Sequence, residues 1–402
     1  FTSIAKGFSV LVLIHHIIAA MGMFLCTLKL TRNSIVAGAS ALFFVLSGFF
    51  LTSMYRPPCF FALSWLPWVA WLWLLIEEHP RQGFFYLAFI SVLQVLTGEF
   101  QIFLLTHICG ISVALGARKP AAFLRQASPH LIFLPIAVVL LAAAQILPSL
   151  EYIFLSAGSD EYFLQQLNSN SYHPLLLFQF ILPIALPLLP TEPGYVIHEY
   201  ILGAEQHFFF ISNHTGIVVF TLALLGIGTL NKRQKLFWVG LPAFFVIISF
   251  GAHLPLAKSI YTALLPFSAV FTNPIYFALP LFFFIPLLAA LNIADHINNQ
   301  RWTTYQLGVP SLLILIIFGL NMAANYFFQH SPPFDGLALR ALRDTFGQQI
   351  VLSGFLLTAL AICYGAATRV KSIPLVLLLL GLAELFSYAP KVLWKTDAKI
   401  FE

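Results

Sequence analysis

The chain has 402 residues, of which 60% are hydrophobic and 9% are charged, and its net charge is +5. A soluble globule needs more charged surface than this composition supplies, so the composition excludes a soluble fold and favours a membrane protein. The cations are scattered singly, which argues against nucleic acid as a partner. The four cysteines have no metal or disulfide spacing.

Twelve apolar runs predict an all-α, polytopic transmembrane bundle, because a spanning helix needs about 20 mostly apolar residues. In chain order the runs are 8–28, 34–53, 59–76, 84–97, 100–117, 131–150, 209–230, 236–250, 275–293, 304–326, 350–368 and 372–389. Pro and Gly inside these runs predict kinks rather than helix ends. We expect one transmembrane domain over 1–402, with helical halves at 1–150 and 209–402 and an extracytoplasmic loop at 151–208.

Lys and Arg concentrate in alternate connections, which predicts that these connections are cytoplasmic. Twelve of the 20 cations lie there: Lys29, Arg32, Arg81, Arg118, Lys119, Arg125, Lys232, Arg233, Lys235, Arg301, Arg369 and Lys371. Most acidic residues fall in the opposite connections, and segment 174–189 is expected to lie on or dip into the outer leaflet. This topology makes the N-terminus of the sequence extracytoplasmic, so we expect at least one span before Phe1.

The sharpest polar cluster is Thr97-Gly98-Glu99-Phe100-Gln101, at an outer turn between two short apolar runs. Gly98 permits a tight reversal, and we expect Glu99 and Gln101 to face an outer cavity. Polar groups at membrane depth are candidates for function. Two interpretations of Glu99 stay open: a functional acid, base or metal ligand, and a solvated loop acid.

Histidines form a second group of candidates. His15 and His16 lie in mid-span about 100° apart on a helix, so at least one should face protein. His107 lies one or two turns below Glu99. Buried histidines on facing helices could hold a haem or another metal centre, or they could form hydrogen bonds between helices.

Further polar residues lie near the outer loop. Gln145 and Glu151 lie at the outer end of a predicted span, where Pro148 could bend the helix and aim Glu151 into a cavity; alternatively, Glu151 caps the membrane exit. Lys258 could meet a lipid phosphate, of the bilayer or of a substrate. The loop also contains His198, Glu199, Glu205 and His207. Their spacing matches no metal pattern, so no metal site is predicted, although a divalent cation stays open as a cofactor.

The triplet Asn213-His214-Thr215 has the pattern of a glycosylation acceptor. It lies against the start of an apolar run, so we do not expect it to be used.

Several motifs resemble the YfhO-like bacterial membrane proteins, within the GT-C superfamily of polytopic glycosyltransferases. The likeness covers nearly the whole chain, although each motif is short. The motifs are His15 with Ala19, Gly22 and Phe24; Leu46-Ser47-Gly48-Phe49; Trp65-Leu66-Pro67; Gly98-Glu99-Phe100-Gln101; Gln145 to Glu151; Gly251 with Pro255; and Phe271-Thr272-Asn273-Pro274.

The resemblance implies a GT-C-like fold in the bacterial inner membrane and transfer of a sugar from a polyprenyl-phosphate carrier at the outer face. The carrier and membrane lipids are the expected partners. Glu99 and Glu151 are the catalytic candidates, and the substrate-binding candidates are Gln101, His15, His16, Gln145, Lys258 and Asn273. The family's usual catalytic acid lies in its first outer loop, which would precede Phe1, so we expect the sequence to be truncated at its N-terminus and at its C-terminus.

The departures from the family pattern favour an alternative. Glu99 stands for a His, Phe100 for a Pro, and Thr272 for the Arg expected before Asn273. Because an Arg is the natural clamp for a donor phosphate, its loss suggests a catalytically degenerate relative that serves as an accessory subunit of a larger membrane complex. A transporter lacks the inverted repeat that such folds use.

Overall fold

The computed structural model describes residues 2–156, 167, 170–180, 212–263, 273–299, 308–317, 319, 350–360, 362 and 373–393. No strand occurs among the described residues, which confirms the all-α prediction. The α-helices are α1 (Thr2–Thr31), α2 (Ser34–Val45), α3 (Gly48–Ser53), α4 (Pro57–Ser64), α5 (Leu66–Ile76), α6 (Pro80–Val95), α7 (Phe100–Ala117), α8 (Pro120–Leu141), α9 (Ala143–Ser156), α12 (Ile217–Thr229), α13 (Lys232–Lys235), α14 (Leu241–Ser249), α15 (Pro255–Ala263), α16 (Leu279–Asn299) and α19 (Ile373–Leu393). Shorter turns are η1 (Pro174–Phe180), η3 (Leu236–Gly240), η4 (Gly251–His253) and η6 (Pro274–Ala278), and two further helices cover Gly308–Ile317 and Ile350–Leu360.

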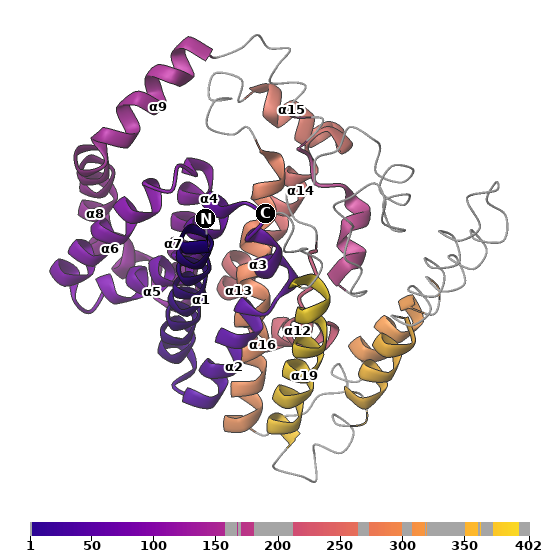
Figure 1. The fold of residues 1–402 in the computed structure, drawn as a ribbon. Helices are drawn as coiled ribbons and strands as arrows, with labels where there is room; N and C mark the ends of the chain where they lie inside the picture. Colours follow the sequence, from indigo (N-terminus) through magenta and orange to yellow (C-terminus); the bar gives the residue numbers. More distant parts are fainter. Residues whose placement is uncertain are drawn as a thin grey trace, which may run out of the picture.

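Helices from both predicted halves pack into one bundle (Figure 1). Helix α1 contacts α2 and α5, α2 contacts α16, and α16 contacts α12, while α19 packs on α12, α2 and α3. Helices α6, α8 and α9 extend to one side of this bundle. Segments that are far apart in sequence therefore build the centre of the molecule.

In the described part of the chain, five helical segments are long and apolar enough to cross a membrane: Lys6–Thr31, Pro57–Ile76, Phe100–Ala117, Pro120–Leu141 and Pro274–Asn298. They overlap five of the predicted runs, whereas the predicted total of twelve spans is not confirmed. Other predicted runs form shorter apolar helices. Helix α2, for example, has 12 residues and reaches about 18 Å, against a hydrocarbon core of about 30 Å.

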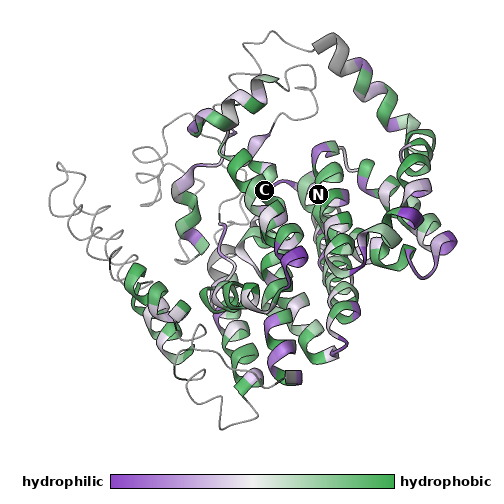
Figure 2. Cartoon of the chain, turned by 180° about the vertical axis from the view of Figure 1, so that it is seen from behind, coloured by the Kyte–Doolittle hydropathy of each residue, from purple (hydrophilic) through white to green (hydrophobic). Residues whose placement is uncertain are grey.

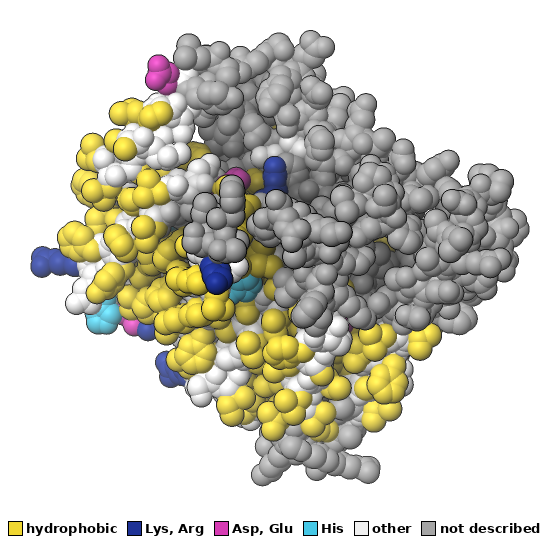
Figure 3. Space-filling model, viewed as in Figure 1, with side chains coloured by type: hydrophobic (Ala, Val, Ile, Leu, Met, Phe, Trp, Pro, Cys, Tyr) yellow, Lys and Arg dark blue, Asp and Glu magenta, His cyan; other side chains and the backbone are white. Residues whose placement is uncertain are grey.

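Large apolar side chains cover much of the outer surface, as expected of a protein that contacts lipid. On α8, Ile132, Phe133 and Leu140 are exposed to 64%, 58% and 71% of their surface. Figure 2 shows hydrophobic residues along most of the described helices, and Figure 3 shows few charged side chains among the apolar ones on the face in view. These features are consistent with a membrane protein.

Two predicted runs are not continuous α-helices, and the reasons are local. The run 34–53 breaks after Val45, and the Ser47 hydroxyl accepts the amide of Phe50 at 3.3 Å to begin α3. The run 236–250 contains Pro242, which has no amide hydrogen to donate to the preceding turn. A π-helical turn at Leu236–Gly240 precedes it, and α14 begins with Pro242 in its first turn. Ser47 therefore begins a new helix inside a predicted span, whereas residues 232–249 stay helical through the π-helical turn, so Pro242 does not end the second run.

Charged residues lie at both ends of the described helices. Lys29 and Arg118 both form ion pairs with Glu78, and Arg233 donates to a backbone carbonyl in the last turn of α7. Glu99 lies at the other end of α7, which has 18 residues and is about 27 Å long. Glu99 and these cations therefore lie at opposite ends of α7.

Small residues allow close approach of helices in the bundle. A Cβ on Gly226 of α12 would lie 2.4 Å from the Leu288 carbonyl oxygen of α16, and α12 and α16 pack extensively. By contrast, a Cβ on Gly38 of α2 would meet nothing within 4 Å. Backbone contact at Gly226 cannot relax by rotation of a side chain, so the position requires glycine.

We expect Gly226→Ala to lower the thermal unfolding temperature of the detergent-solubilised protein, because α12 must move away from α16. Gly38→Ala is the matched control, and it should be neutral or stabilising by about 0.5–1 kcal/mol through helix propensity. Equal stability of the two variants would contradict the proposed close packing.

Candidate functional site

Glu99 lies at the N-terminal end of α7, after a tight reversal from α6. Gly98 has a φ of +86°, as the turn prediction requires. Glu99 precedes the first residue of α7, but its side chain does not cap that helix. The positive end of the helix dipole favours a carboxylate at this position. The side chain is half-buried and points its oxygen at a residue of another segment.

Tyr276 connects Glu99 to Arg56. The Tyr276 hydroxyl donates to Glu99 Oε1 at 3.3 Å and accepts from a guanidinium nitrogen of Arg56 at 3.4 Å. Tyr276 is buried in η6, and Arg56 is an exposed residue that directly precedes α4. Three segments therefore bring together a carboxylate, a phenol and a guanidinium.

Burial raises the pKa of Glu99 above its ordinary value, while the charge of Arg56 and the hydrogen bond from Tyr276 oppose this shift. The net direction is upward because the desolvation cost of the charged carboxylate is the largest of the three effects. Glu99 is thus a better proton acceptor than an ordinary surface carboxylate.

Amide side chains fix this arrangement. Gln101 donates from Nε2 to the Asn273 carbonyl at 2.8 Å and accepts the Asn273 amide at 3.2 Å. Asn170 Nδ2 donates to Asn273 Oδ1 at 2.9 Å, and the Asn170 carbonyl accepts the amide of Ile275 at 3.1 Å. The two substrate-binding candidates Gln101 and Asn273 therefore contact each other, and in this structure they hold η6 so that Tyr276 lies beside Glu99.

A histidine pair lies next to these amides in sequence and space. Ser171 accepts the amide of Ala252 at 2.8 Å, which brings His173 and His253 to a ring-centroid distance of 4.7 Å. Burial and the neighbouring His253 lower the pKa of His173 to about 4, so the imidazole is neutral at physiological pH. No group of three or more His, Cys, Asp or Glu side chains suited to a metal occurs among the described residues.

His15 and His16 both pack against aromatic side chains of the protein. Each Nδ1 hydrogen-bonds a carbonyl of its own helix at 2.9 Å. His15 packs 4.4 Å from the Phe61 ring, and His16 packs 5.0 Å from Phe60. The structure thus gives these two residues an aromatic packing role in α1, and they make no hydrogen bond to a facing helix through Nδ1.

His107 forms hydrogen bonds to two other helices, which was one of the two interpretations of this residue. Trp73 Nε1 donates to His107 Nδ1 at 3.2 Å, and His107 Nε2 lies 3.1 Å from the Ser91 hydroxyl. Because Trp73 can only donate, Nδ1 is the acceptor and Nε2 carries the hydrogen. His107 lies on α7 itself and joins it to α5 and α6.

No contact among the described residues brings the remaining candidates to Glu99. Gln145 and Glu151 lie on α9, which packs on α8, and Glu151 is exposed. A shared cavity of Glu151 and Glu99 therefore stays a prediction. Lys258 lies on α15, but its side chain is outside the described residues, as are His198, Glu199, Glu205 and His207.

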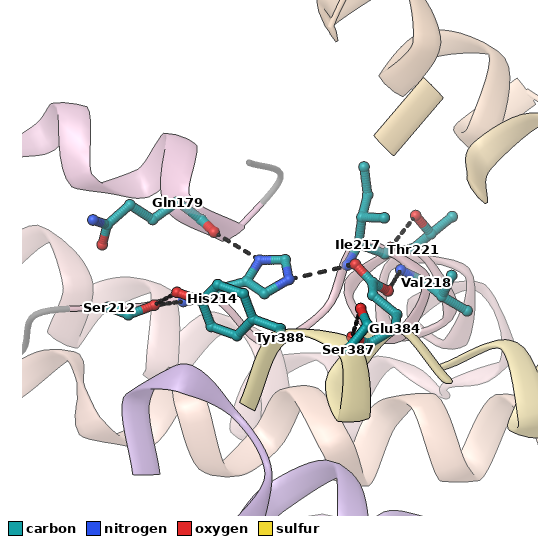
Figure 4. Close-up of polar contacts among 9 residues, drawn as sticks. All are labelled: Gln179, Ser212, His214, Ile217, Val218, Thr221, Glu384, Ser387 and Tyr388. Carbon is teal, nitrogen blue, oxygen red and sulfur yellow. Dashed lines mark hydrogen bonds and ion pairs between the residues drawn. The ribbon is translucent and has the colours of Figure 1, made fainter. Parts of the chain in front are cut away.

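A second polar cluster, which the sequence analysis missed, surrounds Glu384 of α19 (Figure 4). Its carboxylate accepts the amides of Ile217 at 2.6 Å and Val218 at 2.9 Å, and it lies 3.4 Å from His214 Nε2. All four residues are buried. The sequence contained a signal for this cluster, because Glu384 is an acid inside an apolar run and such residues rarely lack a partner.

The cluster joins four segments around His214. His214 Nδ1 lies 3.2 Å from the Gln179 carbonyl, and the His214 carbonyl accepts the amide of Gly48 at 2.6 Å. The Tyr388 ring packs 4.7 Å from the imidazole. A neutral imidazole has one N–H group, so it can donate either to the Gln179 carbonyl or to the Glu384 carboxylate. Burial of Asn213, His214 and Thr215 confirms that the triplet is no accessible glycosylation acceptor in this fold.

Comparison with protein-family models, curated proteins and solved structures finds no match. The fold and the two clusters define a helical protein with several potential membrane spans and ionisable groups buried between its helices. Its function is therefore argued from the Glu99 cluster.

Glu99→Gln should alter the pH dependence of stability. A carboxylate whose pKa is raised by folding costs stability when it ionises, so the cost is absent at about pH 4 and develops as pH rises through the folded-state pKa. We expect the variant to match the wild type at about pH 4 and to unfold at a higher temperature at about pH 8. Glu151→Gln, which removes an exposed carboxylate, is the control; a similar gain in that variant would refute the assignment to burial of Glu99.

Glu384→Ala should destabilise the protein by about 2–5 kcal/mol, because two buried amides and His214 lose their acceptor. Ser387→Ala is the control, since Ser387 makes only a local hydrogen bond to the Glu384 carbonyl. Thermal unfolding in detergent measures both. Equal losses in the two variants would show that the carboxylate does not hold the N-terminus of α12.

Proposed function

We propose that this chain is a membrane glycosyltransferase of GT-C type that transfers a sugar from a polyprenyl-phosphate carrier at the end of the bundle where Glu99 lies. The observation that carries the proposal is the convergence of Glu99, Tyr276 and Arg56 from three segments. A base and a phosphate-binding cation are the two groups that this reaction requires. The resemblance of the motifs to YfhO-like proteins suggested the class of reaction.

In the proposed reaction an acceptor hydroxyl attacks the anomeric carbon of the sugar. A bond forms between the acceptor oxygen and that carbon, and the bond from the carbon to the phosphate oxygen breaks with its electron pair on the phosphate. The Glu99 carboxylate takes the hydroxyl proton. The raised pKa of Glu99 supports this role, because a general base works best when its pKa is near the working pH.

Arg56 is proposed to bind the carrier phosphate. The sequence has Thr272 where a family arginine was expected, and Arg56 brings a guanidinium to Tyr276, four residues beyond that position. A guanidinium matches phosphate through its fork of donors. This contact supports activity although position 272 holds no arginine.

The proposed location is a bacterial cytoplasmic membrane, with Glu99 at the extracytoplasmic side. Lys29, Arg118 and Arg233 lie at the opposite end of the helices. Cations in short connections favour the cytoplasmic side, so the charge distribution supports this orientation and an extracytoplasmic start of the sequence.

A second candidate function is a degenerate accessory subunit of a membrane complex. Tyr276 links Arg56 to Glu99, so the guanidinium and the carboxylate balance each other's charge without a substrate. A monodisperse monomer after purification in mild detergent would count against this alternative.

The proposal is tested by sugar transfer from a polyprenyl-phosphate donor to candidate acceptors. Glu99→Gln should lower turnover by about 100-fold or more, as loss of a general base does. Arg56→Gln should raise the KM for the donor, and Arg56→Lys should restore part of the affinity. Lys232→Gln, at an exposed cation of the opposite end, is the control and should leave turnover unchanged.

Unchanged turnover in both Glu99→Gln and Arg56→Gln would exclude this site. Glu151→Gln, tested in parallel, examines the second predicted acid. Wild-type protein that transfers no sugar and purifies with a partner would favour the accessory subunit.

A further inference from the structure

A pocket of about 510 Å³ opens at the end of the bundle opposite to Glu99. It lies where α1, α5 and α7 end. Its lining residues are Leu25, Leu28, Lys29, Leu30, Arg32, Trp71, Leu74, Glu78, Ala117 and Arg118. None of these residues takes part in the Glu99 cluster, so the pocket is a separate feature of the fold.

The charges of the pocket do not cancel. Lys29 pairs with Glu78, and Arg118 pairs with Glu77 and Glu78 at 2.9 Å each. Arg32 is exposed, and its guanidinium has no acid partner among the described residues. Three cations thus face two carboxylates, which leaves one positive charge at Arg32. The hydrogen bond from Lys29 lowers the pKa of Glu78, so the ion pairs persist at physiological pH.

Arg32 has an unusual backbone. Its φ is +56°, and it is the non-glycine residue with a positive φ in the described part of the chain. Such a conformation costs on the order of 1 kcal/mol in an L residue and often marks a functional position. At the end of α1 the backbone amide of Arg32 donates a hydrogen bond to the Leu28 carbonyl at 2.8 Å, and Asn33 then caps α2. The strained turn keeps a cation at the pocket.

The rest of the pocket wall is apolar. Leu25 and Leu28 come from the last turns of α1, and Trp71 and Leu74 come from α5. Lys29, Glu78 and Arg118 mark the charged ends of helices that are long enough to span a bilayer. Tryptophan is enriched at this depth, where lipid headgroups lie. An apolar wall beside an excess cation suits an amphiphile with an anionic headgroup.

We propose that this pocket binds an anionic phospholipid of the surrounding bilayer, with its phosphate at Arg32 and Lys29 and an acyl chain against Leu25 and Leu28. Basic pockets between transmembrane helices on the cytoplasmic side recognise lipid headgroups in this way. The bound lipid would join α1, α5 and α7 at this end. The inference does not depend on the proposed glycosyltransferase activity.

The test uses the full chain in detergent and a water-soluble probe, dihexanoyl-phosphatidylglycerol, titrated by calorimetry. Arg32→Gln should weaken binding about tenfold, as expected for the loss of one charge-assisted hydrogen bond. Lys232→Gln removes an exposed cation of the same end outside the pocket and should change affinity by less than about twofold. Glu78→Gln should bind the probe more tightly, because it removes a negative charge from the pocket.

Two further measurements distinguish the ligand. Dihexanoyl-phosphatidylcholine, which has no net charge, should bind more weakly than the glycerol lipid, and inorganic phosphate should not displace the lipid at equal concentration. Equal losses in Arg32→Gln and Lys232→Gln, weaker binding in Glu78→Gln, or displacement by phosphate alone would overturn the proposal. Ala117→Phe fills the pocket without changing its charge and should abolish binding, while thermal unfolding without lipid confirms that each variant is folded.

Discussion

The need to give every buried polar group a partner governs this structure. At the start of α12 the amides of Ile217 and Val218 have neither a preceding turn nor water to bond, and Glu384 from α19 supplies both acceptors. His214 then approaches the same carboxylate, and its carbonyl accepts the amide of Gly48. One carboxylate therefore sets the position of α19 against α12 and, through His214, against α3. Loss of such an acceptor at membrane depth would leave these amides without a hydrogen-bond partner, which costs several kcal/mol per group.

The same requirement builds the Glu99 cluster in another way. Gln101 and Asn273 satisfy each other's amide groups, so η6 is tied to the start of α7. This connection positions Tyr276, so that its hydroxyl lies between Glu99 and Arg56. The amides fix the geometry that brings the Glu99 carboxylate and the Arg56 guanidinium to the same hydroxyl. A site of this kind is positioned by residues that need not touch a substrate.

The two ends of the bundle differ in how they treat charge. At the end with Lys29, Glu78 and Arg118, the ions pair with each other at a surface that water reaches, and such pairs contribute little to stability. At the other end Glu99 is half-buried, and burial raises its pKa. Charge is therefore paired at the surface at one end of the bundle and is partly buried at the other.

The sequence by itself determined the class of fold. Composition and apolar runs predicted helices and a membrane environment, Gly98 predicted the reversal before α7, and the charge pattern predicted the separation of Glu99 from Lys29 and Arg118. These are local properties, because they depend on the hydrophobicity and backbone freedom of neighbouring residues. The prediction of twelve spans is not confirmed, and Ser47 begins a new helix inside one of the apolar runs.

Only the tertiary structure decided which residues meet. Arg56 and Glu99 are brought together through Tyr276, and Glu384 bonds to amides 166 and 167 residues away in sequence. Spacing along one chain does not encode such contacts, because they depend on how whole helices pack. The sequence identified Glu99, but the guanidinium beside it and the amides that hold its neighbours are consequences of packing.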